Sequence, residues 1–95
     1  MSTYVYDIVG SEALDSFLAQ RTELVLIDFW AERCGPCRMV GPVLEHLAEQ
    51  YAGKIVIAKI DVDTESNQEL AQKYAVTSIP QVTLVQSGNV VDQFV

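Results

Sequence analysis

The feature that most restricts the fold is a pair of cysteines placed between a predicted strand and a predicted helix. The run at residues 24–30 is the most apolar in the chain and is partly β-branched, which predicts a buried central strand. Cys34 and Cys37 follow it, and a helical pattern begins directly behind them. Backbone N–H groups and the helix dipole stabilise negative charge at such a helix start. We therefore expect Cys34 to form a thiolate.

These are the only two cysteines in the chain, and their spacing favours redox chemistry over a structural crosslink. A Cys34 thiolate can attack a disulfide, and Cys37 can resolve the mixed disulfide that forms. A bridge across so short a loop would add little stability. We expect Cys34 to be exposed and Cys37, one turn further in, to be more buried. Between them, Gly35 permits a close backbone approach, and Pro36 suits the first turn of a helix.

Composition and charge disfavour several other classes of function. A zinc site needs about four ligands. Beyond the cysteines the chain offers only His46, in no such pattern, so we expect no metal. The net charge of −7 at pH 7 would repel nucleic acid and anionic membrane surfaces. Glycines of a dinucleotide-binding fingerprint are absent, so we expect no cofactor.

The apolar runs are too short to span a bilayer. The N-terminal residues show no basic region followed by an apolar core, so we expect no signal peptide. We therefore expect a cytoplasmic protein that does not bind membranes. Repeats, low-complexity tracts and Gly/Ser linkers are also absent, which predicts a single domain over residues 1–95.

The spacing of apolar residues predicts strands that alternate with helices. We expect strands at residues 4–9, 24–30, 54–60, 82–85 and 90–95, the last two joined by a hairpin turn at 86–89. Helices are expected from Ser11, as an N-cap, across 35–51 with a kink at Pro42, and from a capping box at 66–69. This order implies parallel strand pairs with right-handed crossovers and an antiparallel edge.

Two charged residues fall within the predicted strands. Asp28 stands in the middle of the 24–30 run, where a carboxylate is expensive to bury and where desolvation would raise its pKa. The alternative is that Asp28 faces a polar cleft. Lys59, on the neighbouring predicted strand, is either the electrostatic partner of Asp28 or a solvated lysine at a strand end.

The segment 28–38, Asp-Phe-Trp-Ala-Glu-Arg-Cys-Gly-Pro-Cys-Arg, resembles the active-site segment of the thioredoxin family. Further matches follow in order: Pro42 to the helix-kinking proline, 58–63 to the third-strand motif, 74–80 to the loop ending in a cis-proline, and Gly88 to the hairpin turn. The resemblance implies a thioredoxin-like α/β fold. Its mixed central sheet would have about five strands flanked by three helices, without the usual C-terminal helix.

The same resemblance implies a dithiol–disulfide oxidoreductase, a thioredoxin-type protein-disulfide reductase. Its partners would be disulfide-containing proteins and a thioredoxin reductase, either NADPH- or ferredoxin-linked. Asp28 would be the buried acid that handles the proton of Cys37. A cis bond between Ile79 and Pro80 would leave the Ile79 backbone free to pair with an extended substrate, and Trp30 would line that groove. The alternative is a non-catalytic binding or chaperone-like subunit, which would not need both thiols and Asp28.

Three positions depart from the family pattern. Arg33 replaces the usual tryptophan before the first cysteine, and its positive charge is expected to favour the Cys34 thiolate. Gln81 replaces the usual threonine after the cis-proline, which affects the expected substrate range. The chain stops at Val95, where the family continues into a C-terminal helix. We expect this to leave one face of the sheet bare and to allow self-association, or else reduced stability.

Overall fold

The computed structural model describes residues 4–95. In chain order its elements are β1 (Val5–Asp7), α1 (Ser11–Ala19), β2 (Leu24–Trp30), α2 (Cys37–Gln50), β3 (Ile55–Asp61), the 3-10 turn η1 (Glu65–Asn67), α3 (Gln68–Lys73), β4 (Gln81–Gln86) and β5 (Asn89–Phe94). Residues 1–3 lie outside the described residues, and the expectation about a signal peptide rests partly on them.

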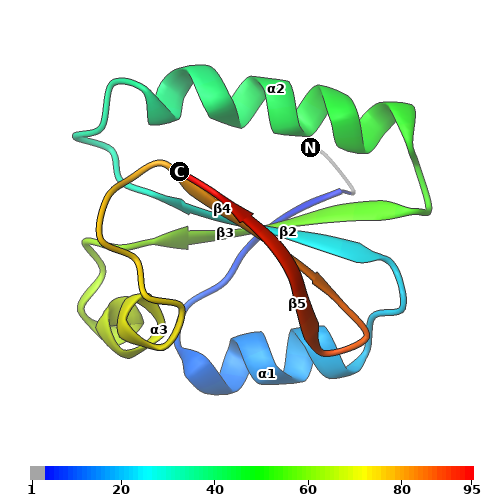
Figure 1. Ribbon diagram of the computed structural model, residues 1–95, viewed down its shortest axis with the longest axis horizontal. Helices are drawn as coiled ribbons and strands as arrows, with labels where there is room; N and C mark the ends of the chain where they lie inside the picture. The colour runs from blue at the N-terminus through cyan, green and yellow to red at the C-terminus, as the bar shows by residue number, and fades with distance from the viewer. Residues whose placement is uncertain (1–3) are drawn as a thin grey trace.

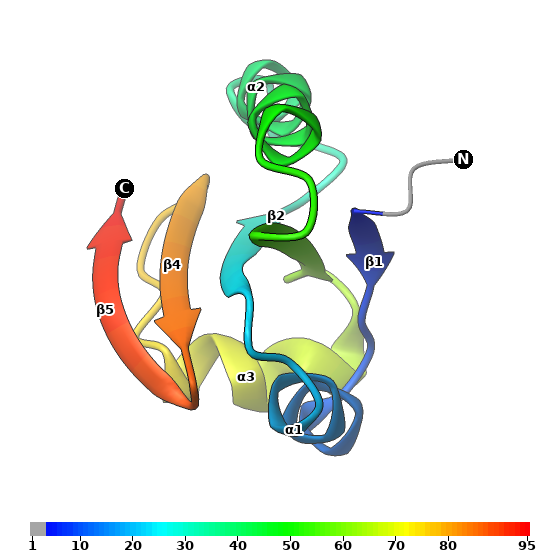
Figure 2. The ribbon, with the colours of Figure 1, turned by 90° about the vertical axis from the view of Figure 1, so that its right-hand side faces the viewer.

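The strands form one mixed sheet in the order β1-β3-β2-β4-β5. The central strand β2 runs parallel to β3 and antiparallel to β4. At the two edges, β1 pairs in parallel with β3 and β5 pairs antiparallel with β4. One face of the sheet is covered by α2 and the other by α1 and α3 (Figures 1 and 2). The predicted α/β architecture, with a mixed sheet and an antiparallel edge, is confirmed.

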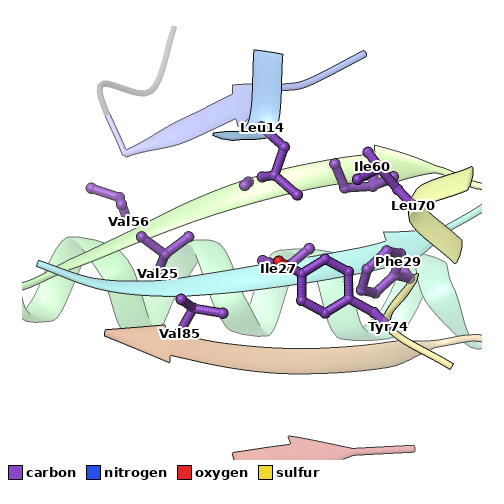
Figure 3. Close-up of a cluster of buried hydrophobic side chains, with 10 residues drawn as sticks. Leu14, Val25, Ile27, Phe29, Val56, Ile60, Leu70, Tyr74 and Val85 are labelled. Carbon is purple, nitrogen blue, oxygen red and sulfur yellow. The ribbon is translucent and has the colours of Figure 1, made fainter. Parts of the chain in front are cut away.

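Strand β2 divides its side chains between the two faces because alternate residues of a strand point in opposite directions. Val25, Ile27 and Phe29 pack into the core formed with α1 and α3 (Figure 3). Leu26 instead packs beneath α2. The same alternation places Asp28 on the α2 face, and α2 is the helix that begins at Cys37.

Two predicted helix caps are wrong. The residue before α1 is Gly10, whose φ of 91° favours glycine, and Ser11 is the first residue of the helix rather than its cap. Likewise, within the part of the chain that is described, no side chain caps α3, and the expected capping box at 66–69 does not form. Asn67 is fully buried, and it accepts a hydrogen bond from the Gly10 N–H while donating one to the Asp61 carbonyl. It joins two loops instead of closing a helix.

The remaining helices and strands form near their predicted ranges, with bounds that differ by one or two residues for most of them, and the kink expected at Pro42 stays a prediction. Pro42 lies inside α2, which begins at Cys37, two residues later than predicted, because Gly35 and Pro36 form a turn before it. The β4–β5 hairpin turns at Ser87 and Gly88, with φ of 51° and 81°. Two positive φ angles match the type I′ turn that the twist of paired strands favours. Over residues 4–95, no helix is both long and apolar enough to cross a membrane.

Candidate active site

The two cysteines lie between the end of β2 and the first turn of α2, and they are joined as a disulfide. Their Cα atoms are 5.3 Å apart. The backbone N–H of Cys37 donates to Sγ of Cys34 at 3.2 Å, so an amide at the start of the helix points at this sulfur. Such a donor favours negative charge on Cys34 once the bridge is reduced, because the thiolate accepts the bond more strongly than the thiol.

Both cysteines are buried. Cys34 is 8% exposed and Cys37 is 5% exposed, so the prediction of an exposed Cys34 is wrong for this oxidised form. The reason is tertiary packing: Ala31 and the partly buried side chains of Trp30, Val62 and Ile79 pack against the pair. Val62 and Ile79 come from loops distant in sequence, and a pattern read along the chain does not contain them.

The residues between the cysteines form a tight turn. The Gly35 carbonyl accepts a hydrogen bond from the Arg38 N–H, and the Pro36 carbonyl accepts from Met39. Pro36 occupies the position before the helix, rather than its first turn as predicted, with φ −59°. A Cβ built on Gly35 would meet no atom within 4 Å. The close approach predicted at Gly35 therefore stays a prediction about a bound partner.

Asp28 is buried in the middle of β2, on the α2 face of the sheet, with 2% of its surface exposed. Its Oδ1 has no hydrogen-bond partner among the described residues. The pKa of Asp28 is raised from its ordinary value of 3.8 to about 6, mainly because burial disfavours the charged carboxylate. The positive charge of Lys59 lowers this pKa, and the negative charge of Glu45 raises it. An acid with such a pKa can take up and release a proton near neutral pH.

Lys59 is the register partner of Asp28 across the β2–β3 ladder. Its Nζ lies 4.5 Å from the centroid of the Trp30 ring, and its charge lowers the pKa of Asp28. Of the two alternatives left open by the sequence, this placement matches an electrostatic partner. The Nε1 of Trp30 is buried and has no hydrogen-bond partner in the described part of the chain.

The loop before β4 brings Ile79 and Pro80 to the site. The Ile79–Pro80 peptide bond is cis, as the resemblance implied. Ile79 packs against the disulfide together with Trp30. Pro80 lines an apolar groove of about 340 Å³ on the α2 face, together with side chains of α2, β4 and β5.

Arg33 is held by a residue that sequence reasoning missed. Its Nε donates to Oδ2 of Asp63 at 2.8 Å and its Nη2 donates to Oδ1 at 3.0 Å. The hydrogen bond and charge of Asp63 raise the pKa of Arg33, and the charge of Asp61 adds to them. The pairing compensates much of the positive charge that was predicted to act on Cys34. The only available signal was that residues 62 and 63 directly follow β3, just as the cysteines follow the neighbouring strand β2.

Gln81 is not on the surface, although it was singled out as a substrate determinant. It is 2% exposed, and its Nε2 donates to the Tyr74 carbonyl at 3.2 Å and to Oγ1 of Thr83 at 3.4 Å. It therefore connects the start of the 74–80 loop to β4. Among residues 4–95, no three His, Cys, Asp or Glu side chains are grouped so that they could hold a metal ion.

Comparison with known proteins agrees with this geometry. The family model Thioredoxin matches residues 5–95. A thioredoxin of Chlorobaculum thiosulfatiphilum is 49% identical over 85 residues, which are 90% of this chain and 72% of that protein. A bifunctional thioredoxin reductase/thioredoxin of Mycobacterium leprae is 49% identical over 71 residues, 75% of this chain and 15% of that one.

Among solved structures, a mutant thioredoxin from Halobacterium salinarum matches with a TM-score of 0.85 and 38% identity, covering all of this chain and 81% of that chain. The sheet order, the disulfide at the start of α2 and these similarities lead to one conclusion. The chain belongs to the thioredoxin family, and it is a thioredoxin-type protein-disulfide reductase with Cys34 and Cys37 as its redox pair.

Proposed function

We propose that Cys34 attacks the target disulfide and that Cys37 resolves the product. The Cys34 thiolate forms a bond to one target sulfur, and the second target sulfur leaves as a thiolate. The Cys37 thiolate then attacks Sγ of Cys34, which releases the first target sulfur and forms the Cys34–Cys37 bridge. Two electrons pass from the dithiol to the target. The observation that supports this order is the Cys37 N–H directed at Sγ of Cys34.

Asp28 takes the proton of Cys37 in this proposal. Its burial and its pKa of about 6 suit a base that must accept a proton in a site closed to bulk water. Lys59 limits how far that pKa rises. We expect Asp28→Asn to slow release of the product more than formation of the mixed disulfide, because Cys34 is activated by the helix terminus instead. Rapid-mixing kinetics would resolve the two steps, and equal slowing of both would contradict this role.

Trp30, Ile79 and Pro80 form the proposed groove for the target. The support is that Trp30 and Ile79 already cover the disulfide, so a target that reaches Cys34 must contact them. Oxidised protein would be recycled by a thioredoxin reductase, as the fused relative suggests, with NADPH or a ferredoxin-linked donor as the electron source. A cytoplasmic location would keep the pair available for reduction.

The test is reduction of a protein disulfide in the presence of thioredoxin reductase and NADPH. Wild-type protein should turn over, and Cys34→Ser should not. Cys37→Ser should accumulate a mixed disulfide with the target, visible by mass spectrometry and removed by dithiothreitol. A double variant lacking both thiols that still supports the cellular role would favour the non-catalytic binding subunit instead.

Self-association is a separate proposal, and it concerns the α2 face of the sheet beside β4 and β5, which is the face expected to be bare. The apolar groove of about 340 Å³ lies there, lined by Pro80, Leu84 and Phe94 among others, and Phe94 is exposed. An exposed apolar surface of this kind can be covered by a second copy of the chain. Sedimentation over a range of concentrations would detect the pairing, and a single monomeric species at all concentrations would exclude it.

A further inference from the structure

A polar groove lies next to side chains that pack against the disulfide, and it shares no lining residue with the apolar groove. It has a volume of about 430 Å³ and lies between the end of β3, the start of α3 and the 76–79 loop. Val62 and Ile79 belong both to this groove and to the cluster that packs against the cysteines. A target bonded to Cys34 therefore lies next to its opening, where Arg33 and Asp63 form the rim.

We propose that this groove binds a basic side chain of the target protein, lysine or arginine, next to the attacked cysteine, and that Asp63 is the residue that accepts it. The inference rests on the proposed function, because it concerns the target of the same reaction. It makes Asp63 a specificity-determining residue for disulfide reduction.

The carboxylate of Asp63 is fixed in place but not saturated. Arg33 takes one hydrogen-bonding position on each of its oxygens. A carboxylate offers about four such positions, so both oxygens retain one. The Asp63 backbone is itself tied, because its N–H donates to Oδ1 of Asp61 at 2.9 Å. The Asp63 side chain is 48% exposed, so an incoming ammonium or guanidinium group can reach it.

The other wall of the groove is also ordered. Nε2 of Gln68 donates to the Val62 carbonyl at 2.8 Å. The hydroxyl groups of Thr77 and Ser78 lie on the exposed loop opposite. These hydroxyls add neutral acceptors for a donor group, so the groove has acceptors on both sides.

Charge decides between a basic and an acidic target residue. Asp63 and Arg33 line the groove, and Asp61 lies close enough for its charge to act on Arg33. Two aspartates and one arginine leave an excess of one negative charge. A target carboxylate that binds the remaining N–H groups of Arg33 is repelled by Asp63 and Asp61, whose charges both act on that guanidinium. A target cation is attracted by both, and the net charge of −7 acts in the same direction.

The experiment uses three peptides of equal length, each with one intrachain disulfide. They differ only in the residues flanking the cysteines, which are Lys, Gln or Glu. The rate constant for oxidation of the reduced protein is measured for each peptide. Flanking charges also change the intrinsic reactivity of a disulfide, so each rate is divided by the rate with dithiothreitol. We expect the corrected rate for the Lys peptide to be about threefold that for Gln, about 0.7 kcal/mol at 1.4 kcal/mol per tenfold, with Glu slower than Gln.

Asp63→Asn and Asp15→Asn provide a matched pair, because both remove one negative charge. Asp15 lies on α1, is 63% exposed and pairs with Lys73 at 3.6 Å, outside the groove. Asp63→Asn should reduce the Lys-to-Glu ratio of the corrected rates to near one, and Asp15→Asn should leave it unchanged. In wild type the ratio should also fall as salt is raised, a measurement that needs no variant.

Equal corrected rates for the three peptides in wild type, or a faster Glu peptide, would overturn the inference while leaving the proposed function standing. So would an equal loss of preference in the two variants, since that would indicate long-range charge and not the groove. A protein oxidised by none of the peptides, but oxidised by small disulfides, would overturn the inference and the proposed function together.

Discussion

The two faces of the sheet differ in how completely they are buried. Beneath α1 and α3, the core includes Phe29, Leu14 and Ile60, all fully buried. Beneath α2, the fully covered cluster is smaller, and neighbours such as Leu44 and Leu84 are only partly buried and line a groove. The redox pair lies at the start of α2, the helix over this less buried face, and it shares Val62 and Ile79 with the core beneath α1 and α3. The larger part of the core and the helix that begins at the redox pair therefore lie on opposite faces of the sheet.

Buried polar groups show the same division. On the α1 and α3 side, Gln81 and Asn67 donate hydrogen bonds to backbone carbonyls. On the α2 side, Asp28 has an oxygen without a partner among the described residues. A satisfied polar group strengthens a core, whereas an unsatisfied carboxylate weakens it and becomes easier to protonate. The contrast predicts which substitutions destabilise the protein and which do not.

The largest effect on the free energy of unfolding should come from a large-to-small substitution in the core beneath α1 and α3. Phe29→Ala removes a fully buried ring and should lower the free energy of unfolding by about 3–5 kcal/mol. Leu84→Ala, at the partly buried groove, should cost only about 1 kcal/mol. Urea unfolding of the oxidised proteins measures both. Similar costs for the two variants would show that the faces contribute equally.

The next effect concerns Asp28 and pH. Its folded pKa of about 6 lies above the ordinary 3.8, so between these values the folded state holds the proton more tightly than the unfolded state. The free energy of unfolding should therefore fall as the pH rises from 4 to 7. At about 1.36 kcal/mol for each tenfold change in proton affinity, this group accounts for about 3 kcal/mol. Asp28→Asn should remove that dependence and be more stable than wild type at pH 7; parallel profiles would contradict the assignment.

A smaller effect is expected at Gln81. Gln81→Leu leaves the Tyr74 carbonyl without its side-chain donor and should cost about 1–2 kcal/mol. Gln50→Leu, at an exposed position of α2, serves as the control and should cost little. If the two substitutions have the same effect on urea unfolding, the hydrogen bonds of Gln81 do not stabilise the loop.

The smallest effect is expected at the exposed Arg33–Asp63 pair, on the reaction rate of reduced Cys34. Because Asp63 compensates the charge of Arg33, Arg33→Gln should slow alkylation of reduced Cys34 by iodoacetamide at neutral pH less than about twofold. Asp63→Asn leaves Arg33 uncompensated and should speed the same reaction. A large loss of rate in Arg33→Gln would show that the guanidinium acts directly on the thiolate.

The sequence predicted the parts of this fold that depend on neighbours along the chain. The bounds of β2 agree residue for residue, because a buried central strand is marked by its own composition. The cap of α1 and the buried state of Cys34 were not predictable, since they depend on Asn67 and Ile79, far away in sequence. The pairing of Arg33 with Asp63 spans 30 positions and leaves no periodic trace.

The alternation along β2 also limits how the length of this chain can vary. Asp28 pairs with Lys59 on one side and Val82 on the other, so β2 cannot slide against either neighbour alone. Deleting or inserting one residue between 25 and 27 would turn the Asp28 carboxylate into the α1 and α3 core and place Ile27 on the α2 face. Substitutions within β2 can be compensated by repacking, but a change of one in its residue count exchanges the two faces and removes the acid from the thiols.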